Sequence, residues 1–360
     1  MIKKIGILTS GGDCGGLNAV IRSVTLTAIN KYGWKVYGIK DGTEGLIRDP
    51  IDAIELNLKS FESNLMRLGG TFLGSNNSGN PFNYMQKNGK RIDVSDKIIN
   101  GFNKLNLDSL IGIGGDGSMK ILQKLTKKGN INFVGIPKTI DNDVMFNEFS
   151  IGYDTAVNVA TNALDMLQPT AASHKRAMIL EVMGRDAGHI ALNAGIAGGA
   201  DIILIPEIKY SLKSIAKHIE KIKLKERSHI LIVIAEAVRK EDGSKAYVKY
   251  LNGQVRLGGI GNYISDRVSN MTKVETRVTV LGHLQRGAQP SHKDRLIASA
   301  FGVYAVDMIA QKKFNRIVVW QNRKITDIDI DKVAGKSKTI DIKDPLIKVA
   351  KALDIYVGEI

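Results

Sequence analysis

Short apolar runs alternate along the chain with longer stretches in which apolar residues recur at helical spacing. The first run, residues 5–8, ends in a glycine-rich turn, and residues 17–30 then carry a helical pattern. Strands that alternate with helices are typical of mainly parallel sheets with helices on both faces. The sequence therefore predicts an α/β fold, and a length of 360 residues is enough for two lobes. Further runs of this kind, each followed by a polar turn, are residues 109–113, 133–136, 177–182, 202–205 and 230–235.

Three of the turns after these runs have the residues expected of a phosphate site. They are residues 11–13 (Gly-Gly-Asp), 114–118 (Gly-Gly-Asp-Gly-Ser) and 137–143 (Pro-Lys-Thr-Ile-Asp-Asn-Asp). Glycines let backbone N–H groups approach phosphate oxygens, and a helix that begins after such a turn directs its positive dipole end at the anion. Ligands of parallel α/β sheets bind at the carboxyl ends of the strands, where these turns fall. The sequence therefore predicts a phosphoryl-transfer enzyme.

The polar side chains of the second and third turns suit this reaction. Asp116 is placed to bind a Mg²⁺ ion that bridges two phosphates, and the peptides of Gly117 and Ser118 would face the donor. An aspartate such as Asp141, with an ordinary pKa near ~3.9, is ionised at neutral pH and can accept the proton of an attacking hydroxyl. Lys138 adds a positive charge beside the donor.

The net charge of +15 and the single cysteine bear on the partners of the protein and on its cellular compartment. Lysines are scattered without a dense basic run, and aromatic residues make up 6% of the chain, so we expect no nucleic acid partner. No apolar run approaches the ~20 residues that span a bilayer, so we expect no membrane partner. Cys14 has no second cysteine with which to form an internal disulfide, which fits a reducing, cytoplasmic setting.

The three turns, in this order and spacing, resemble those of the 6-phosphofructokinase family in its small bacterial type. The resemblance extends from residue 4 to about residue 310. Other kinases that share the Gly-Gly-Asp-Gly turn and act on NAD or a lipid would leave residues 139–143, 183–185 and 283–287 unexplained. The further segments that match the family pattern are residues 70–75, 150–156, 173–176, 181–185, 275–277 and 281–287.

The resemblance implies a phosphofructokinase fold, in which each of two α/β lobes has a mainly parallel sheet sandwiched by helices. It assigns the phosphoryl donor and Mg²⁺ to a lobe formed by residues 1–152 and 266–316. It assigns fructose 6-phosphate to residues 153–265 and 317–360, and the latter include a C-terminal tail.

The implied activity is that of a cytoplasmic, glycolytic transferase that phosphorylates the C1 hydroxyl of fructose 6-phosphate to give fructose 1,6-bisphosphate. The active form would be a homo-oligomer, with a tetramer favoured over a dimer. In that oligomer Arg176 and Arg277 would reach the 6-phosphate bound in a neighbouring subunit's site. Paired arginines suit this role because the guanidinium fork matches the geometry of a phosphate.

The resemblance also implies roles for individual residues. Asp141 would deprotonate the C1 hydroxyl, Asp143 would support it, and Lys138 and Arg185 would complete the catalytic group. The remaining residues implied in sugar-phosphate binding are Thr139, Met183, Gly184, Glu236, His283 and Arg286, with Arg185 shared. The residues implied in donor binding are Gly11, Gly12, Asn77, Gly115, Asp116, Gly117 and Ser118, with Asp116 also the metal ligand.

The identity of the donor depends on three positions. Pyrophosphate-dependent members of the family usually have Asp where this chain has Gly117, and that Asp would repel the α-phosphate of ATP. Lys138 points to pyrophosphate, because well-studied ATP enzymes have Gly there and a lysine can stabilise a leaving phosphate. Asn77 replaces an arginine of the common ATP type and fits a subgroup with users of either donor. The sequence favours ATP, with reversible transfer from pyrophosphate as the alternative.

A non-catalytic regulatory subunit that binds a sugar phosphate is the alternative from a different class. The presence of Asp116, Asp141 and Arg185 disfavours it, because inactive relatives usually lose the base or the metal-binding acid. We expect weak or no control by ADP or phosphoenolpyruvate, because Leu26 and Gln168 replace effector-binding arginines of the family.

Overall fold

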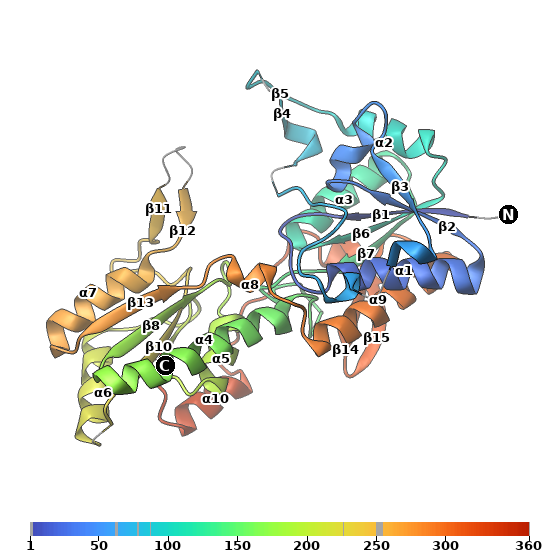
Figure 1. Ribbon diagram of the computed structural model, residues 1–360. Coiled ribbons are helices and arrows are strands. Elements are labelled where there is room, and N and C mark those ends of the chain that lie inside the picture. The colour runs from blue at the N-terminus through green and yellow to red at the C-terminus, as the bar shows by residue number, and fades with distance from the viewer. Residues whose placement is uncertain are drawn as a thin grey trace. The chain divides into compact units, whose positions relative to one another are not determined.

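The computed structural model describes residues 3–61, 64–77, 79–86, 88–225, 227–249 and 255–359. The chain forms two compact units, and it crosses between them three times (Figure 1). Unit 1 comprises Met1–Thr155 and Arg286–Ser337, and unit 2 comprises Ala156–Gln285 and Lys338–Ile360.

Unit 1 is built on a seven-stranded sheet in the order β15-β14-β7-β6-β1-β2-β3. The five inner strands run parallel, whereas β3 and β15 at the two edges run antiparallel to their neighbours. This arrangement confirms the predicted mainly parallel α/β architecture. The strands are β1 (Lys4–Thr9), β2 (Lys35–Ile39), β3 (Ala53–Leu56), β6 (Ser109–Gly114), β7 (Phe133–Pro137), β14 (Arg316–Gln321) and β15 (Lys324–Asp329).

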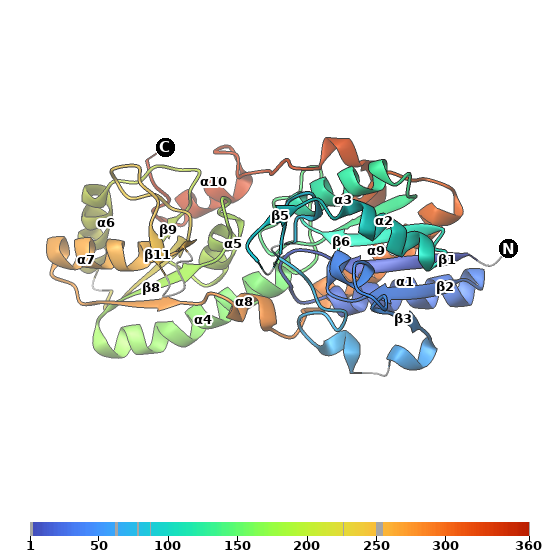
Figure 2. The same cartoon turned by 90° about the horizontal axis from the view of Figure 1, so that it is seen from above.

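Helices cover both faces of this sheet. Helices α2 (Ser95–Lys104) and α3 (Asp116–Lys128) lie on one face, and α1 (Leu17–Tyr32) and α9 (His292–Ala310) pack together on the other (Figure 1, Figure 2). The core under α2 and α3 is apolar and continuous, and it stabilises the strand ends that carry the glycine turns. Short elements on the rim are η1 (Gly42–Leu46), η2 (Leu58–Phe61), η3 (Leu65–Arg67), η4 (Pro81–Asn83), β4 (Tyr84–Met85), β5 (Arg91–Ile92) and η5 (Ile330–Lys332).

Unit 2 has a smaller sheet in the order β13-β8-β10-β9, in which all four strands are parallel. A short antiparallel pair, β11 (Tyr247–Lys249) and β12 (Val255–Leu257), projects from it. The strands of the sheet are β8 (Ala177–Val182), β9 (Ile202–Leu204), β10 (Ile230–Ala235) and β13 (Thr276–Val280). The helices are α4 (Tyr153–His174), which begins in unit 1, α5 (His189–Ala197), α6 (Leu212–Leu224), α7 (Ile260–Thr272), α8 (Leu284–Gly287), which ends in unit 1, and α10 (Pro345–Ala352).

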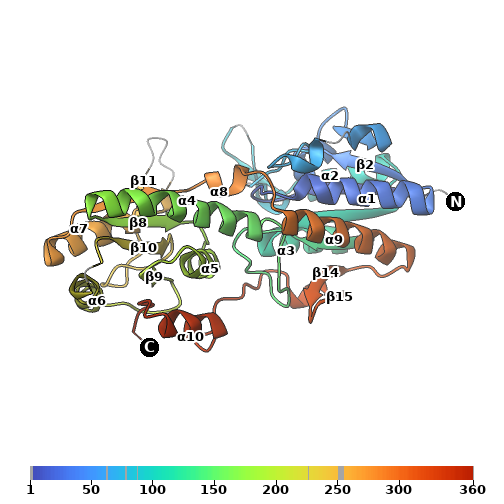
Figure 3. The same ribbon diagram turned by 60° about the horizontal axis from the view of Figure 1, so that its bottom comes forward.

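The C-terminal tail completes unit 2. Helix α10 packs against α5, and the chain beyond it runs beside β9, where Tyr356 forms a parallel bridge to Ile202 (Figure 3). The amide of Tyr356 donates to the carbonyl of Asp201, and the amide of Ile203 donates to the carbonyl of Tyr356. The tail therefore covers a sheet edge that would otherwise expose unpaired backbone groups.

The compact units differ from the sequence-based division by about 20 residues at two of its three boundaries, and by three residues at the first. Residues 266–285 belong to unit 2 because β13 pairs with β8, whereas the sequence reading assigned them to the first lobe. Residues 317–337 belong to unit 1 because β14 pairs with β7, whereas the sequence reading assigned them to the second lobe. Among the described residues, no helix is both long and apolar enough to cross a bilayer.

Candidate active site

The glycine turn after β1 lies against two other segments of unit 1. A Cβ on Gly11, whose φ is +82°, would come 2.9 Å from the hydroxyl of Ser118, and a Cβ on Gly12 would come 2.6 Å from Nη1 of Arg286. Arg286 Nη1 also donates to the carbonyl of Asp13 at 3.1 Å. At Gly11 the positive φ favours glycine, whereas at Gly12 a side chain would require Arg286 to move. Arg286, predicted to bind the sugar phosphate, thus lies beside the predicted donor turn.

The turn after β6 opens directly into α3. A Cβ on Gly115 would lie 3.4 Å from the carbonyl oxygen of Lys138, so the second and third predicted turns are adjacent. Nothing lies within 4 Å of a Cβ on Gly117. The N-terminal turn of α3 therefore presents its backbone amides with open space at Gly117, as an anion-binding helix start requires.

Asp116 is the first residue of α3 and is 8% exposed. Its Oδ2 accepts a hydrogen bond from the hydroxyl of Ser337 at 3.1 Å. Among the described residues no three His, Cys, Asp or Glu side chains are grouped as a metal cage. Mg²⁺ is usually held by one or two carboxylates together with phosphate oxygens and water. A single well-oriented carboxylate therefore fits a Mg²⁺ ion that arrives with a phosphate donor.

Lys138 is buried, with 3% of its surface exposed. Its ammonium donates to the carbonyl oxygen of Ser10 at 3.0 Å and also to that of Gly12. Burial lowers the pKa of Lys138, and Arg286 adds a smaller effect in the same direction. The side chain therefore carries its amino group into the first glycine turn, on the predicted donor side.

The acidic turn after β7 is held by its own hydrogen bonds. The amide of Asp141 donates to the hydroxyl of Thr139 at 3.1 Å, and that hydroxyl donates to Oδ2 of Asp141 at 3.3 Å. Asn142 has a φ of +52°, accepts from the amide of Ser150 at 2.9 Å and donates to the carbonyl of residue 148. Asp141 and Asp143 are 6% and 3% exposed. The acids are thus fixed in a shielded turn.

Unit 2 carries the loop that follows β8, and side chains from three other segments fix it. The amide of Met183 donates to Oε1 of Gln285 at 2.8 Å, and the amide of Arg185 donates to Glu236 at 3.2 Å. The amide of Gly188 donates to both oxygens of Glu207, at 3.0 and 3.2 Å. The loop therefore has a defined backbone, while the Arg185 side chain is exposed.

Arg176 and Arg277 share one carboxylate. Nε of Arg176 donates to Oε2 of Glu275 at 2.8 Å, and Arg277 pairs with the other oxygen. The hydrogen bond from Arg176 lowers the pKa of Glu275. A carboxylate held between two guanidinium groups occupies the kind of position that suits a phosphate.

Arg176 and Arg277 lie at the amino-terminal ends of the unit 2 strands, whereas the loop after β8 lies at the carboxyl ends. Arg176 directly precedes β8, whereas Met183 directly follows it, and β8 has six residues. At about 3.3 Å per residue the strand separates them by about 20 Å. The structure therefore brings Met183, Gly184, Arg185 and Glu236 together within unit 2, and it sets Arg176 and Arg277 apart from them.

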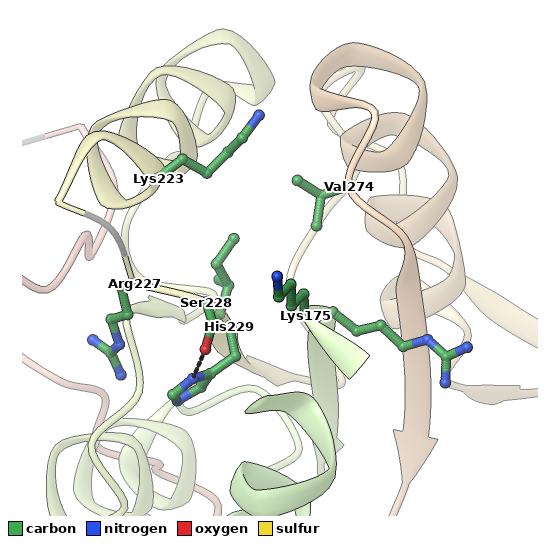
Figure 4. Close-up of a pocket in the computed structure, with 8 residues that line it drawn as sticks. Lys175, Lys223, Arg227, Ser228, His229 and Val274 are labelled. Atoms are coloured by element: carbon green, nitrogen blue, oxygen red, sulfur yellow. Dashed lines mark hydrogen bonds between the residues drawn. The ribbon is translucent and has the colours of Figure 1, made fainter. Parts of the chain in front are cut away.

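A basic cavity of about 320 Å³ opens at these amino-terminal ends, where β8, β10 and β13 begin (Figure 4). Figure 4 shows Lys223 and Arg227 pointing in different directions, and each is paired with an acid, Lys223 with Glu220 and Arg227 with Asp201. The cavity is lined by Lys175, Arg176, Lys223, Arg227, Ser228, His229, Ile230 and Val274.

Two further predicted residues are exposed. His283 lies in the turn before α8, and Asn77 lies in the loop between η3 and η4. The sequence reading missed Glu207, Gln285 and Asn142. Gln285 stands inside a segment already matched to the family, and Glu207 follows the end of β9 as other candidate residues follow their strands.

Comparison with known proteins gives consistent results. The family model described as Phosphofructokinase matches residues 4–309. "ATP-dependent 6-phosphofructokinase 1" of Synechocystis sp. is 53% identical over 357 residues, which is 99% of each chain. "Pyrophosphate--fructose 6-phosphate 1-phosphotransferase" of Dictyoglomus thermophilum is 40% identical and covers 94% of this chain and 95% of its own. The crystal structure of Pichia pastoris phosphofructokinase in the T-state superposes with a TM-score of 0.80 at 27% identity, over 99% of this chain and 37% of that longer one.

Proposed function

The chain belongs to the phosphofructokinase family, and from this we propose that it transfers the terminal phosphoryl group of ATP to fructose 6-phosphate in glycolysis. The observation that carries the proposal is the assembly of three turns in unit 1. The turn after β1 lies against Ser118 of the second turn, and Gly115 of the second lies against Lys138 of the third. The buried Lys138 ammonium then returns to the first turn. Such a convergence of backbone amides and buried charge is what phosphoryl transfer requires.

In the proposed mechanism Asp141 accepts the proton of the C1 hydroxyl as the C1 oxygen attacks the terminal phosphorus. The bond from phosphorus to the leaving oxygen of ADP breaks as the new bond forms. Thr139 holds the Asp141 carboxylate through its hydroxyl, and Asp143 supports the same turn. Lys138 and the first-turn amides stabilise the charge on the donor phosphates. Asp116 would hold Mg²⁺, which neutralises part of that charge.

Unit 2 supplies the sugar-phosphate side of the proposed reaction. Met183, Gly184, Arg185 and Glu236 would hold the sugar of the same chain's substrate. The separation of Arg176 and Arg277 from this loop supports a role in a neighbouring subunit's site, and hence a homo-oligomer, with a tetramer favoured. A cytoplasmic setting is proposed as well, since the single Cys14 is a free thiol with no second cysteine for an internal disulfide.

Gly117 favours ATP over pyrophosphate. A nucleotide needs room beyond its β-phosphate, and the space around a Cβ at Gly117 is open. Pyrophosphate is the second candidate donor. The Lys138 ammonium reaches into the first turn, where its positive charge would replace contacts that a nucleotide otherwise makes. The names of the two curated relatives described above include both donors.

The test is formation of fructose 1,6-bisphosphate from fructose 6-phosphate and Mg²⁺ with ATP or with pyrophosphate. We expect turnover with ATP, and we expect Gly117→Asp to lower kcat/KM for ATP about thirtyfold through charge repulsion with the α-phosphate. The matched control, Gly117→Asn, adds a side chain of the same size and shape without the charge. Turnover with pyrophosphate alone would move the proposal to that donor. No product with either donor would favour the non-catalytic alternative.

A further inference from the structure

The C-terminal segment Gly335–Ile340 contains the last crossing from unit 1 to unit 2, at Ser337 and Lys338. The sequence reading gave the tail no role. In unit 1 the segment contacts Asp116 of the proposed active site. In unit 2 it contacts Glu207, which fixes the loop after β8.

In unit 1 the segment holds Asp116. The amide of Gly335 donates to the Asp116 carbonyl at 3.2 Å, and the hydroxyl of Ser337 donates to Asp116 Oδ2 at 3.1 Å. Ser337 also forms an antiparallel bridge to Val144, the residue after the acidic turn. The segment thus touches both acid-bearing turns of unit 1.

In unit 2 the segment holds Glu207. The amide of Ile340, a residue 5% exposed, donates to Oε1 of Glu207 at 3.0 Å. The same oxygen accepts from the amide of Gly188 at 3.0 Å. Gly188 ends the loop that starts at Met183, and a Cβ there would come 2.4 Å from the side chain of Ile205. Glu207 therefore links the tail backbone to the end of that loop.

We propose that residues 335–340 are a positioning segment for the reaction. Ser337 orients the carboxylate of Asp116, and Ile340, acting through Glu207, fixes the backbone from Met183 to Gly188. The inference rests on the proposed function. A site held by side chains whose own positions are fixed keeps reacting groups within the narrow tolerance that catalysis needs. Hydrogen bonds to a carboxylate suit this role because the charge makes them stronger than neutral ones.

The unit 2 end is tested by changes in one donor, Ile340, and in the acceptor, Glu207. Ile340→Pro removes the amide hydrogen, whereas Ile340→Val keeps it and nearly all of the side chain. Glu207→Ala removes both acceptors, whereas in Glu207→Gln one oxygen remains to accept from both amides. We expect Ile340→Pro and Glu207→Ala to raise KM for fructose 6-phosphate about tenfold with a smaller effect on kcat. Ile340→Val should match the wild type, and Glu207→Gln should fall between.

The unit 1 end is tested at Ser337. Ser337→Ala should weaken binding of Mg·ATP about fivefold by calorimetry and leave KM for fructose 6-phosphate unchanged, because only the Asp116 contact is lost. Ser337→Thr keeps the hydroxyl and should restore binding. Asp354→Asn is the control within the tail. Asp354 pairs with Lys221 and Lys225 on the surface, so its loss should change neither constant.

The pattern of constants separates the possible outcomes. Separate effects on the two substrates, from the two ends of one segment, support the proposal. Constants equal to the wild type in Ile340→Pro, Glu207→Ala and Ser337→Ala would overturn it. The same loss in all variants, Asp354→Asn included, would also overturn it, because the tail would then act only on overall stability. An inactive wild type would contradict the proposed function instead, and Mg·ATP binding would still report on Ser337.

Discussion

Lys138, Asp141 and Asp116 of unit 1 are buried, whereas Arg176 of unit 2 is partly exposed and Arg277 is exposed. Lys138, Asp141 and Asp116 have 3–8% of their surface exposed. The Lys138 ammonium donates to the first glycine turn, and Asp141 is hydrogen-bonded within its own turn. The side chains of Arg176 and Arg277 are 25% and 56% exposed and share an exposed glutamate. Unit 1 is thus organised before any substrate binds. In unit 2 the loop backbone is organised, but the charges that would meet a phosphate are not enclosed.

This difference has a physical origin. Burying charged groups is costly unless each one is satisfied, so a buried set must be arranged by the fold itself. Exposed arginines need no such arrangement, because water solvates their charge. They contribute binding energy only when a partner or ligand displaces that water. Substitutions in unit 1 should therefore change catalysis and stability, whereas substitutions of the unit 2 arginines should change binding alone.

The largest effect is expected at Asp141. Asp141→Ser removes the carboxylate proposed to accept the hydroxyl proton, and general base catalysis of this kind contributes about a thousandfold to kcat. KM for fructose 6-phosphate should change little, because the carboxylate acts mainly in the transition state. The rate of fructose 1,6-bisphosphate formation measures both constants.

The matched control is Asp186→Ser. Asp186 is also an aspartate of a candidate loop, but its side chain is 63% exposed and pairs with Lys245. This variant should keep wild-type rates. If Asp141→Ser retained most of its activity, the proposed mechanism would be wrong.

The second effect concerns a buried acid that supports unit 1. Asp294 in α9 is fully buried and accepts hydrogen bonds from the amides of Gly152 and Thr155, at 2.9 and 2.8 Å, and from the hydroxyl of Thr155. Burial raises the pKa of Asp294 from 3.8 to about 6, although the bonds from Thr155 oppose this rise. Between those two values the folded state binds more protons than the unfolded state, so stability falls as pH rises.

The stability of the wild type relative to Asp294→Asn should therefore fall by about 2 kcal/mol between pH 4 and pH 7. Asparagine does not titrate, so the pH dependence belongs to Asp294 even though the variant has a constant offset from its lost acceptors. Urea unfolding at a series of pH values measures the difference. Thr155→Val, which removes a hydrogen bond that lowers the pKa, should extend the fall to higher pH. A difference independent of pH would contradict the assignment.

The sequence was sufficient to predict the parallel sheets and the three turns of unit 1. Apolar runs such as residues 5–8 and 109–113 lie in β1 and β6, and the glycines follow them directly, so local pattern and structure coincide. Glu207, Gln285 and Asp294 were not predicted. Each acts on a backbone amide far away in the chain, such as Gly188 or Gly152, and their contacts arise only when distant strands and helices pack.

The sequence pattern also could not predict the boundaries of the units, because they depend on which distant strands pair. Residues 276–280 and 316–321 were not among the predicted strands, and a local pattern does not say which sheet a strand joins. Pairing of β13 with β8 and of β14 with β7 decides this, and both pairs are remote in sequence.

The smallest effect is expected at the exposed arginines, and it gives the sharpest test of the comparison. Arg277→Ala should raise KM for fructose 6-phosphate about tenfold through loss of a charged hydrogen bond to phosphate. Stability should change by less than about 0.5 kcal/mol, because the side chain is on the surface. Arg277→Lys keeps the charge but loses the fork, so its KM should lie between.

Mixed oligomers then distinguish a residue that serves its own chain from one that serves a neighbour. In a mixture of Asp141→Ser and Arg277→Ala chains, refolded together, some sites would combine the intact Asp141 of one chain with the intact Arg277 of the other. If Arg277 acts in a neighbouring subunit's site, those sites should have the wild-type KM. A fraction of the activity of the mixture should then show that KM. If Arg277 acts within its own chain, every active site would keep the raised KM, and the mixture would behave as diluted Arg277→Ala protein. That outcome would also contradict the inference drawn from the two ends of the unit 2 strands. Arg277 pairs with Met178 of β8, five residues before Met183, so about 17 Å of strand separates it from the loop that would hold the same substrate.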